Sequence, residues 1–359
     1  MRISVISAVE LDSSLRSRWH SVQAASPELA SPFFCPQFTE AVACIRSDVR
    51  VAILEDDTQV VGFFPFQRRR GGFGRPVGLG LSDYHGMITT GTLEWDPVTV
   101  VRHCGLVRWK FDHLPVSQDA FRPWVTAVDE SPIMDVSQGF EHYQATRLAL
   151  GGTEIRTIQR RLRKLEREVG EIRFVANDLD HKIFSRILAL KSQQCRRSGA
   201  YDFLQRAPWI QRFLHRLFSM DTDEGFRGVL SSLYAGDKCI AAHFGIRSRD
   251  IWHWWFPCYE AEFRQYSPGL LLLYRLAEHA AAAGLRHVDL GKGLSRYKLN
   301  LMTKSVGLAE GCVARQSLLM LLPQMAEATQ RMESRAGFRT LFRIPAGLVR
   351  RARRRARFM

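Results

Sequence analysis

Short alternating and apolar stretches divide the first third of the chain into strands and helices. The strand pattern begins at Arg2–Ile6, and helical stretches follow near Leu15–Ala25 and Phe38–Ile45. In "VRVAILEDDTQVVGFFPFQRRR" two apolar arms flank the polar group Glu55–Thr58, which supplies turn residues. The pattern therefore predicts a strand, two helices and a β-hairpin.

An amphipathic helix follows the glycine pair Gly151-Gly152, which marks a predicted boundary. Its apolar residues recur at spacings of three and four and stop before Gly170; they are Ile155, Ile158, Leu162, Leu165 and Val169. Six basic residues lie in the same helix, between Arg156 and Arg167. We expect a connecting helix that packs one face, with a nucleic-acid-binding helix as the alternative.

From Glu171 onward the pattern repeats the order of the first third. The strand "EIRFVAN" leads into two helices, "DHKIFSRILALKSQQCRRSG" and "PWIQRFLHRLFS", and then a hairpin turns at Ala235–Lys238. The strand "IWHWWFPCY", a long helix and the strand "HVDLG" complete the unit. This order predicts an α+β fold of two tandem units, 1–150 and 151–315, each a mostly antiparallel sheet flanked by helices. Residues 316–359 are expected to be a helical, Arg-rich tail.

The charge of the chain points to an anionic partner. Its 359 residues are 46% hydrophobic and carry 51 basic against 36 acidic side chains, a formal net charge of +15. This composition indicates a globular protein whose partner is a phosphorylated cofactor, a nucleic acid or an acidic membrane surface. The segment "VRRARRRARF" holds six arginines and is expected to be a solvated or surface-binding extension.

Localisation and metal content are also predicted from the composition. No apolar run approaches the roughly 20 residues that span a bilayer, and the first twenty residues lack the apolar region of a secretory signal. The seven cysteines are scattered without C-x-x-C spacing, so reduced cysteines are expected, with neither a zinc cluster nor a disulfide scaffold. We expect a cytoplasmic protein without a metal.

The start of the long helix offers an anion site. In "RQYSPG", Ser267 stands at the N-cap position and Pro268 at the first helical position. Gly269 and Leu270 would then present N–H groups without intrahelical partners at the positive helix end, with Arg264 just upstream. Ordinary helix capping without a ligand is the alternative.

The same residues resemble a known family. The order of elements and "RQYSPG" resemble the GNAT acyltransferase fold and its pyrophosphate-binding loop, although Ser267 replaces the first glycine of that loop. The stretch "YSPGLLLLYRLAEHAAAAGLRHVDLGKGLSRYK", with "LSDYHG" in the first half, resembles CelD-like acetyltransferases of cellulose biosynthesis. These proteins are relatives of the FemAB aminoacyltransferases and consist of tandem GNAT-like units. The resemblance spans roughly residues 1 to 310.

The resemblance implies a donor site for acetyl-CoA or another acyl-CoA. Backbone amides of the loop would bind the pyrophosphate, and two strands would splay apart to admit the pantetheine. The residues that would supply or frame these contacts are Arg264, Gln265, Tyr266, Ser267, Gly269 and Leu270. No arrangement for a covalent intermediate is visible in the sequence, which favours direct transfer to an amine or hydroxyl.

Candidate catalytic residues lie on and after the last strands of the second unit. Asp289 ends a strand and could position or deprotonate the acceptor, or else cap the glycine turn that follows. His253 shares a strand face with Ile251 and Trp255 and could act as a base or be structural. Lys298 matches the aromatic-Lys pair of FemAB-like proteins and could stabilise an oxyanion, or else lie on the surface.

The first unit could contribute to binding of the acceptor. Asp83, Tyr84 and His85 cluster beside glycines in "LSDYHG". They would hold the acceptor if it lies between the two units, and otherwise they form a polar turn.

Three classes of function follow from these observations. The first is an acyl-CoA-dependent N- or O-acyltransferase acting on a small-molecule or saccharide acceptor, in polysaccharide or cell-envelope biosynthesis. The second is an aminoacyltransferase that uses charged tRNA. The third is a non-catalytic basic protein on nucleic acid or on an anionic membrane at its inner face, with Arg350–Arg357 and the helix of Arg156–Arg167 as its surfaces.

Overall fold

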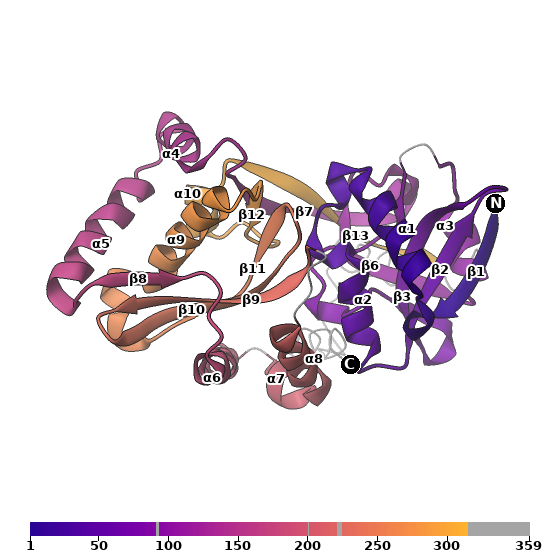
Figure 1. Cartoon of the computed structure of the whole chain (residues 1–359). Helices are drawn as coiled ribbons and strands as arrows, with labels where there is room; N and C mark the ends of the chain where they lie inside the picture. Colours follow the sequence, from indigo (N-terminus) through magenta and orange to yellow (C-terminus); the bar gives the residue numbers. More distant parts are fainter. Residues whose placement is uncertain (91–92, 200, 221–224, 315–359) are drawn as a thin grey trace, which may run out of the picture.

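Thirteen strands form one continuous sheet in the computed structural model, which describes residues 1–90, 93–199, 201–220 and 225–314 (Figure 1). The strand order is β1-β2-β3-β4-β6-β13-β7-β12-β11-β10-β9-β8, and β5 pairs with β3. The strands are β1 Arg2–Ser7, β2 Val49–Glu55, β3 Val60–Arg69, β4 Phe73–Arg75, β5 Ile88–Thr89, β6 Arg108–Pro115, β7 Val125–Asp135, β8 Ile172–Val175, β9 Arg227–Ala235, β10 Lys238–Arg247, β11 Ile251–Tyr259, β12 His287–Asp289 and β13 Lys304–Ala314.

Ten α-helices lie among the described residues, with short 3-10 turns between them. They are α1 Ser13–Ala24, α2 Pro36–Ala43, α3 Pro97–His103, α4 Phe140–Ala149, α5 Glu154–Val169, α6 His181–Arg197, α7 Phe203–Arg206, α8 Pro208–Ser219, α9 Pro268–Ala282 and α10 Arg296–Leu301. The predicted strands, hairpins and helices are present in the predicted order. Within the described ranges only β11–β12 and β4–β6 pair in parallel, so the α+β fold with a mostly antiparallel sheet is confirmed.

In the first half, helices cover both faces of the sheet around β3. On one face α1 packs on β3, where the rings of Trp19 and Phe63 stack with centroids 4.7 Å apart. On the other face α3 and the 3-10 turn Asp119–Trp124 enclose Phe64. Its ring packs edge-on against that of Trp109, with centroids 4.9 Å apart. Burial of these large aromatic side chains on both faces stabilises this half.

The second half has the same layered plan. Helices α6 and α8 cover one face of β9–β11, and α9 covers the other, with α5 packed outside α9. The alternation predicted for β11 is present, since Trp252 and Trp254 point into the α9 layer while His253 and Trp255 point to the opposite face.

Helix α5 packs its apolar stripe as predicted. Four stripe residues are buried, namely Ile155, Ile158, Leu162 and Leu165, while most of the basic side chains of α5 are exposed. The predicted packing of one face is confirmed, and the choice between a connecting helix and a nucleic-acid-binding helix stays a prediction.

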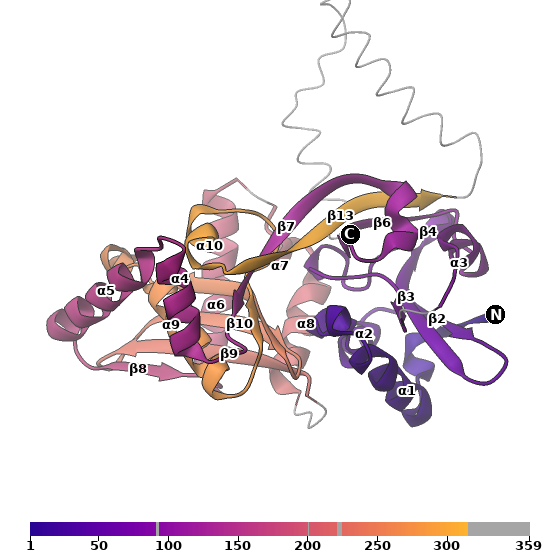
Figure 2. The same cartoon turned by 90° about the horizontal axis from the view of Figure 1, so that it is seen from above.

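Two long strands join the halves. Strand β13 lies between β6 and β7 and pairs antiparallel with both, and the end of β7 pairs with β12 (Figure 2). The last described strand therefore completes the sheet of the first half. The predicted boundary at Gly151-Gly152 falls between α4 and α5. The limits 1–150 and 151–315 stay a prediction, and the tail at 316–359 lies outside the described residues.

None of the described helices has the length and apolar character to cross a membrane.

Candidate functional site

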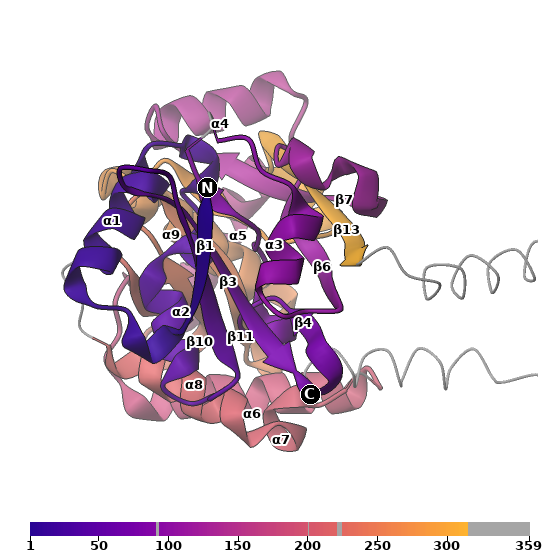
Figure 3. The same ribbon diagram turned by 90° about the vertical axis from the view of Figure 1, so that its right-hand side faces the viewer.

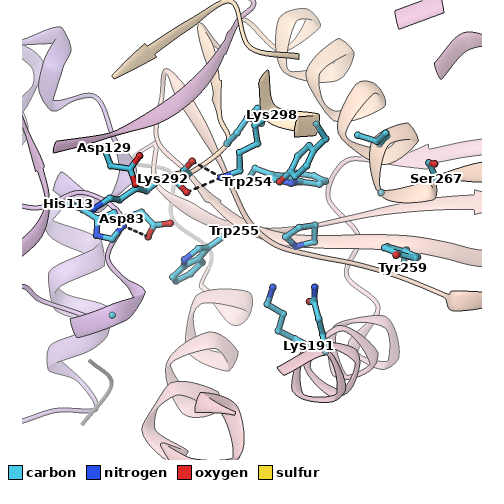
Figure 4. Close-up of a pocket in the computed structure, with 18 of the residues that line it drawn as sticks. Asp83, His113, Asp129, Lys191, Trp254, Trp255, Tyr259, Ser267, Lys292 and Lys298 are labelled. Atoms are coloured by element: carbon cyan, nitrogen blue, oxygen red, sulfur yellow. Dashed lines mark hydrogen bonds and ion pairs between the residues drawn. The ribbon is translucent and has the colours of Figure 1, made fainter. Parts of the chain in front are cut away.

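A cleft of about 930 Å³ opens where β11 and β12 separate (Figure 4). The two strands pair over only three positions, ending at His253 opposite Asp289. Beyond them the β11 edge from Trp254 to Tyr259 has no strand partner on the cleft side, among the residues described. This is the strand separation expected at a pantetheine channel. The lining residues are Gly80, Asp83, His113, Asp129, Lys191, Gln194, Trp254, Trp255, Pro257, Tyr259, Arg264, Ser267, Gly269, Leu270, Leu290, Gly291, Lys292, Tyr297, Lys298 and Glu310.

A β-bulge bends β11 beside this cleft. Trp254 and Trp255 together oppose the single residue Gly245 of β10, because the register shifts between Phe244 and Ile246. A Cβ at Gly245 would lie 2.3 Å from the carbonyl oxygen of His253, so only glycine fits. Both tryptophans of the bulge line the cleft, Trp255 half-buried and Trp254 almost fully buried.

One end of the cleft is the start of α9, where Ser267 is left-handed. Its backbone angles are φ 57° and ψ 54°, and its side chain makes no capping hydrogen bond. Ser267 therefore stands at the predicted N-cap position and Pro268 at the first helical position, but ordinary capping by the serine side chain, the alternative interpretation, is wrong, since an ordinary N-cap also has an extended backbone. The expected free N–H of Leu270 is also wrong, since that group donates to the Ser267 carbonyl at 2.9 Å.

Gly269 retains the expected free donor. Within the described part of the chain its N–H has no acceptor, and the residue lines the cleft. A Cβ at Gly269 would lie 3.7 Å from the ring of Tyr259, so the glycine leaves the helix end open to a ligand. The N-terminus of α9 can therefore accept an anion.

The predicted donor residues divide between two sides of the loop. Arg264, Ser267, Gly269 and Leu270 line the cleft. Gln265 and Tyr266 instead line a separate hollow behind the loop, and the buried Tyr266 donates to Glu168 at 2.8 Å. Their side chains therefore cannot contact a ligand in the cleft.

The other end of the cleft is formed around Asp83 (Figure 4). Its Oδ2 lies 2.8 Å from Nε2 of His253, and its Oδ1 lies 3.5 Å from Nε2 of His113. The Asp83 side chain is 21% exposed, whereas His253 is fully buried. Asp83 thus presents a carboxylate to the cleft while two imidazoles hold it in place.

Asp289 lies behind His253 and away from the cleft. It is 1% exposed and accepts hydrogen bonds from Tyr84 Oη at 2.5 Å, Ser131 Oγ at 2.6 Å and Gly291 N at 2.8 Å. Its Oδ1 is 3.6 Å from Nδ1 of His253. Burial and the Asp289 carboxylate raise the pKa of Tyr84 well above its usual value, so Tyr84 remains a donor.

His85 and Lys298 hold backbone in place. His85 is buried, and its Nε2 accepts from the N–H groups of Asp112 and His113, both at 3.1 Å. Lys298 lines the cleft, and its Nζ donates to the carbonyls of Gly291 at 2.7 Å and Lys292 at 3.1 Å. Burial lowers the pKa of Lys298, and nearby carboxylates partly oppose that shift.

The structure therefore brings together all six residues predicted for catalysis and acceptor binding. They are Asp83, Tyr84, His85, His253, Asp289 and Lys298. Only Asp83 and Lys298 reach the cleft, and the other four lie behind it.

Several lining residues escaped sequence reasoning. Lys191 of α6 faces the donor loop across the cleft, while His113 and Lys292 lie near Asp83 (Figure 4). Lys292 donates to the Asp112 carbonyl at 2.8 Å and to Glu310 Oε1 at 2.5 Å. The polar pair Asp112-His113 near the end of β6 was a usable signal, whereas nothing in the local pattern of α6 singles out Lys191.

Comparison with known families gives one match. Residues 154–299 match the family model described as the Acetyltransferase (GNAT) domain. These residues form a GNAT-type acyltransferase domain. The GNAT-type domain contains β11, β12 and the start of α9, so the donor end of the cleft lies inside it. Asp83 and β13 lie outside it.

Solved structures show the same fold over most of the chain, at identities too low to indicate more. FemX is similar with a TM-score of 0.56, at 8% identity over 87% of this chain and 96% of FemX. The C-terminal domain of a putative lysylphosphatidylglycerol synthetase from Agrobacterium fabrum is similar with a TM-score of 0.52, at 12% identity over 87% of this chain and 95% of that domain. A tandem GNAT protein of the clavulanic acid biosynthesis pathway is similar with a TM-score of 0.51, at 10% identity over 87% of this chain and 98% of that protein. No curated protein matches the sequence.

Proposed function

We propose that the chain is an acyl-CoA-dependent acyltransferase that moves an acyl group directly to an amine or hydroxyl. The observation that carries the proposal is the separation of β11 from β12 beside the open helix end at Gly269. An extended donor with a diphosphate at one end and a thioester at the other suits a cleft of this form.

The donor end offers the groups that a diphosphate requires. The Gly269 N–H lies at the positive end of α9, and the cations of Arg264 and Lys191 line the same cleft. The unpaired β11 edge offers backbone groups to the amides of a pantetheine arm. The thioester would then lie toward Asp83.

Asp83 is the candidate proton acceptor at the other end. The acceptor nitrogen or oxygen attacks the thioester carbonyl carbon and loses its proton to the Asp83 carboxylate. The carbon–sulfur bond breaks as the tetrahedral intermediate collapses, and the thiolate takes up a proton and leaves as the thiol. His253 and Asp289 are positioning residues in this scheme, and Lys298 holds the Gly291–Lys292 turn.

We further propose acetyl-CoA as the donor and a saccharide of the cell envelope as the acceptor class, as the CelD-like resemblance implies. The half-buried Trp255 ring lines the cleft and gives an apolar face on which a sugar ring can stack.

A thermal-shift titration tests the donor site. At 100 times its Kd a ligand stabilises a protein by about 2.7 kcal/mol, which here corresponds to a rise in Tm on the order of 5 °C. We expect this rise with acetyl-CoA. Gly269→Val should remove it by filling the space above the N–H, while Tm without ligand changes little because a Cβ fits there. An unchanged acetyl-CoA titration in Gly269→Val would exclude the proposed donor end.

A charged tRNA is the second candidate donor. The likeness to FemX and to the lysylphosphatidylglycerol synthetase domain, together with the net charge of +15, favours it. The two donors separate in one pair of assays, a thermal shift with acetyl-CoA and filter binding of aminoacylated tRNA. Tight, salt-sensitive tRNA binding without any acetyl-CoA shift would decide for the second candidate.

A further inference from the structure

One face of β4 and β6, next to the cleft, carries exposed basic side chains. Arg108 lies opposite Phe73 of β4 and Ala314 of β13, and cross-strand partners share a face of the sheet. Side chains two residues apart also share a face, which adds Arg75 and Lys110. The intervening residues Trp109 and Phe111 point the other way, into the core under α3. Arg108, Lys110 and Phe73 are exposed (Figure 3 shows β4, β6 and β13 side by side).

Arg75 is the unusual member of this face. Its side chain is half-buried, yet no ion pair or hydrogen bond joins its guanidinium to any other residue that the structure describes. Burial lowers the pKa of Arg75, the carboxylate of Asp112 partly opposes this, and Arg108 and Arg69 lower it further. Arg69 itself pairs with Asp48 at 3.3 Å. A half-buried cation beside like charges is unfavourable, and the Asp112 carboxylate offsets this only in part, so a bound anion would stabilise Arg75.

The basic face continues into the cleft. Asp112 follows Lys110 on the same face of β6, and its carbonyl accepts from Lys292, which lines the cleft with Glu310. Asp112 lies four positions after Arg108 along β6, a distance of about 13 Å. A ligand of disaccharide or nucleotide-sugar length could therefore reach from Arg108 to the acceptor end.

We infer that Arg75, Arg108 and Lys110 bind a phosphate group carried by the acyl acceptor. Guanidinium forks and an ammonium group are the usual protein ligands of phosphate. The stacked pair of Arg108 over the Phe73 ring, with 4.5 Å between guanidinium and centroid, holds one fork in place. The assignment of the anion to the acceptor rests on the proposed function, whereas the anion site itself does not.

The experiment titrates inorganic pyrophosphate into the full chain by calorimetry, with CoA present at saturation so that the donor end is filled. A parallel arm uses vesicles of 30% phosphatidylglycerol in phosphatidylcholine. We expect binding of pyrophosphate to fall about tenfold or more in the variant Arg75→Gln/Arg108→Gln/Lys110→Gln. Arg122→Gln, an exposed arginine on the opposite side of β6, is the matched control and should bind as the native protein does.

The outcomes separate the sources and the two proposals. If pyrophosphate binds through the three residues, the acceptor is a soluble phosphate compound. If the vesicles bind through these residues and pyrophosphate does not, the acceptor is a lipid-linked phosphate compound. Vesicle or pyrophosphate binding that is equal in the triple variant and in the native protein would overturn the inference. A triple variant that loses CoA binding would also overturn it, by assigning these residues to the donor. Gly269→Val should lose CoA binding and retain pyrophosphate binding. Failure of the donor proposal can therefore be distinguished from failure of the anion-site inference.

Discussion

Single buried side chains set the geometry around the bulge of β11. His243 on β10 is fully buried, and its Nε2 accepts the Trp255 N–H at 3.0 Å. Its ring stacks on Trp254 with centroids 4.3 Å apart. Burial, helped by His253, lowers the pKa of His243 well below its usual value, so the ring is neutral and accepts the hydrogen bond.

His243 should make the stability depend on pH. Its folded pKa is lowered, so its contribution is complete above the unfolded value of about 6.5 and is lost as pH falls below it. Each pH unit below 6.5 should cost up to about 1.4 kcal/mol. Urea unfolding at pH 7.5 and 5.5 should therefore show a decline about 1 kcal/mol larger in the native protein than in His243→Gln. Equal declines would mean that His243 is protonated in the fold.

The residue types of the site could be predicted from the sequence, but which side chains are buried and which line the cleft could not. The motifs around Asp83, His253 and Asp289 pointed to residues that the structure brings together, and their roles stay a prediction. Which carboxylate faces the cleft depends on the bulge at Trp254-Trp255 and on the contact of Tyr84 with Asp289, 205 positions apart in sequence. Alternation along one strand carries no information about either.

At the scale of the element, α9 begins differently from an ordinary helix. The sequence "SPG" predicted the helix start correctly, since α9 runs from Pro268 to Ala282. It could not reveal the left-handed backbone of Ser267, because serine at an N-cap is normally extended. The glycine of the related loops at this position explains the conformation, since glycine adopts it without strain.

Substitutions at Ser267 should show that strain. Ser267→Gly should raise the free energy of unfolding by up to about 1 kcal/mol, because a left-handed residue costs roughly 1–2 kcal/mol and glycine's extra entropy offsets part of the gain. Ser267→Ala should cost less than about 0.5 kcal/mol, because no capping bond is lost. The control is Asp96→Ala, whose side chain caps α3 through Thr99 N at 2.8 Å and should cost about 1 kcal/mol. Equal costs in the two alanine variants, measured by urea denaturation, would contradict the assignment.

At the scale of the molecule, β13 connects the two halves within one sheet, because it pairs with β6 and β7. The pattern predicted tandem units because each half has its own strand–helix–helix–hairpin order. The last strand that the pattern located in the second unit, 151–315, is "HVDLG", and it gave no hint that residues 304–314 form a strand that pairs with β6 and β7. Strand pairing between distant segments depends on the whole sheet, so local periodicity cannot locate it.

Gly311 of β13 offers a test of that connection. A Cβ there would lie 2.1 Å from the Trp124 carbonyl oxygen and 2.5 Å from the Phe111 ring, so Gly311→Ala must displace backbone. We expect a loss of about 3 kcal/mol and one cooperative transition in calorimetry for both native and variant proteins. Gly269→Ala, whose Cβ meets nothing closer than 3.7 Å, is the matched control. Two separate transitions, of which the variant shifts only one, would show that the halves unfold independently.

The position of β13 also has a consequence for biosynthesis. When β7 has left the ribosome, β6 and β7 still have open edges, and their partner is 179 residues of translation away, from Asp135 to Ala314. At about 5–20 residues per second this interval lasts roughly 10–40 s. Until then the nascent first half has exposed edges on β6 and β7, and such edges are sites for pairing with other chains. Pairing with another chain is therefore expected to compete with folding during this interval, before β13 has been synthesised.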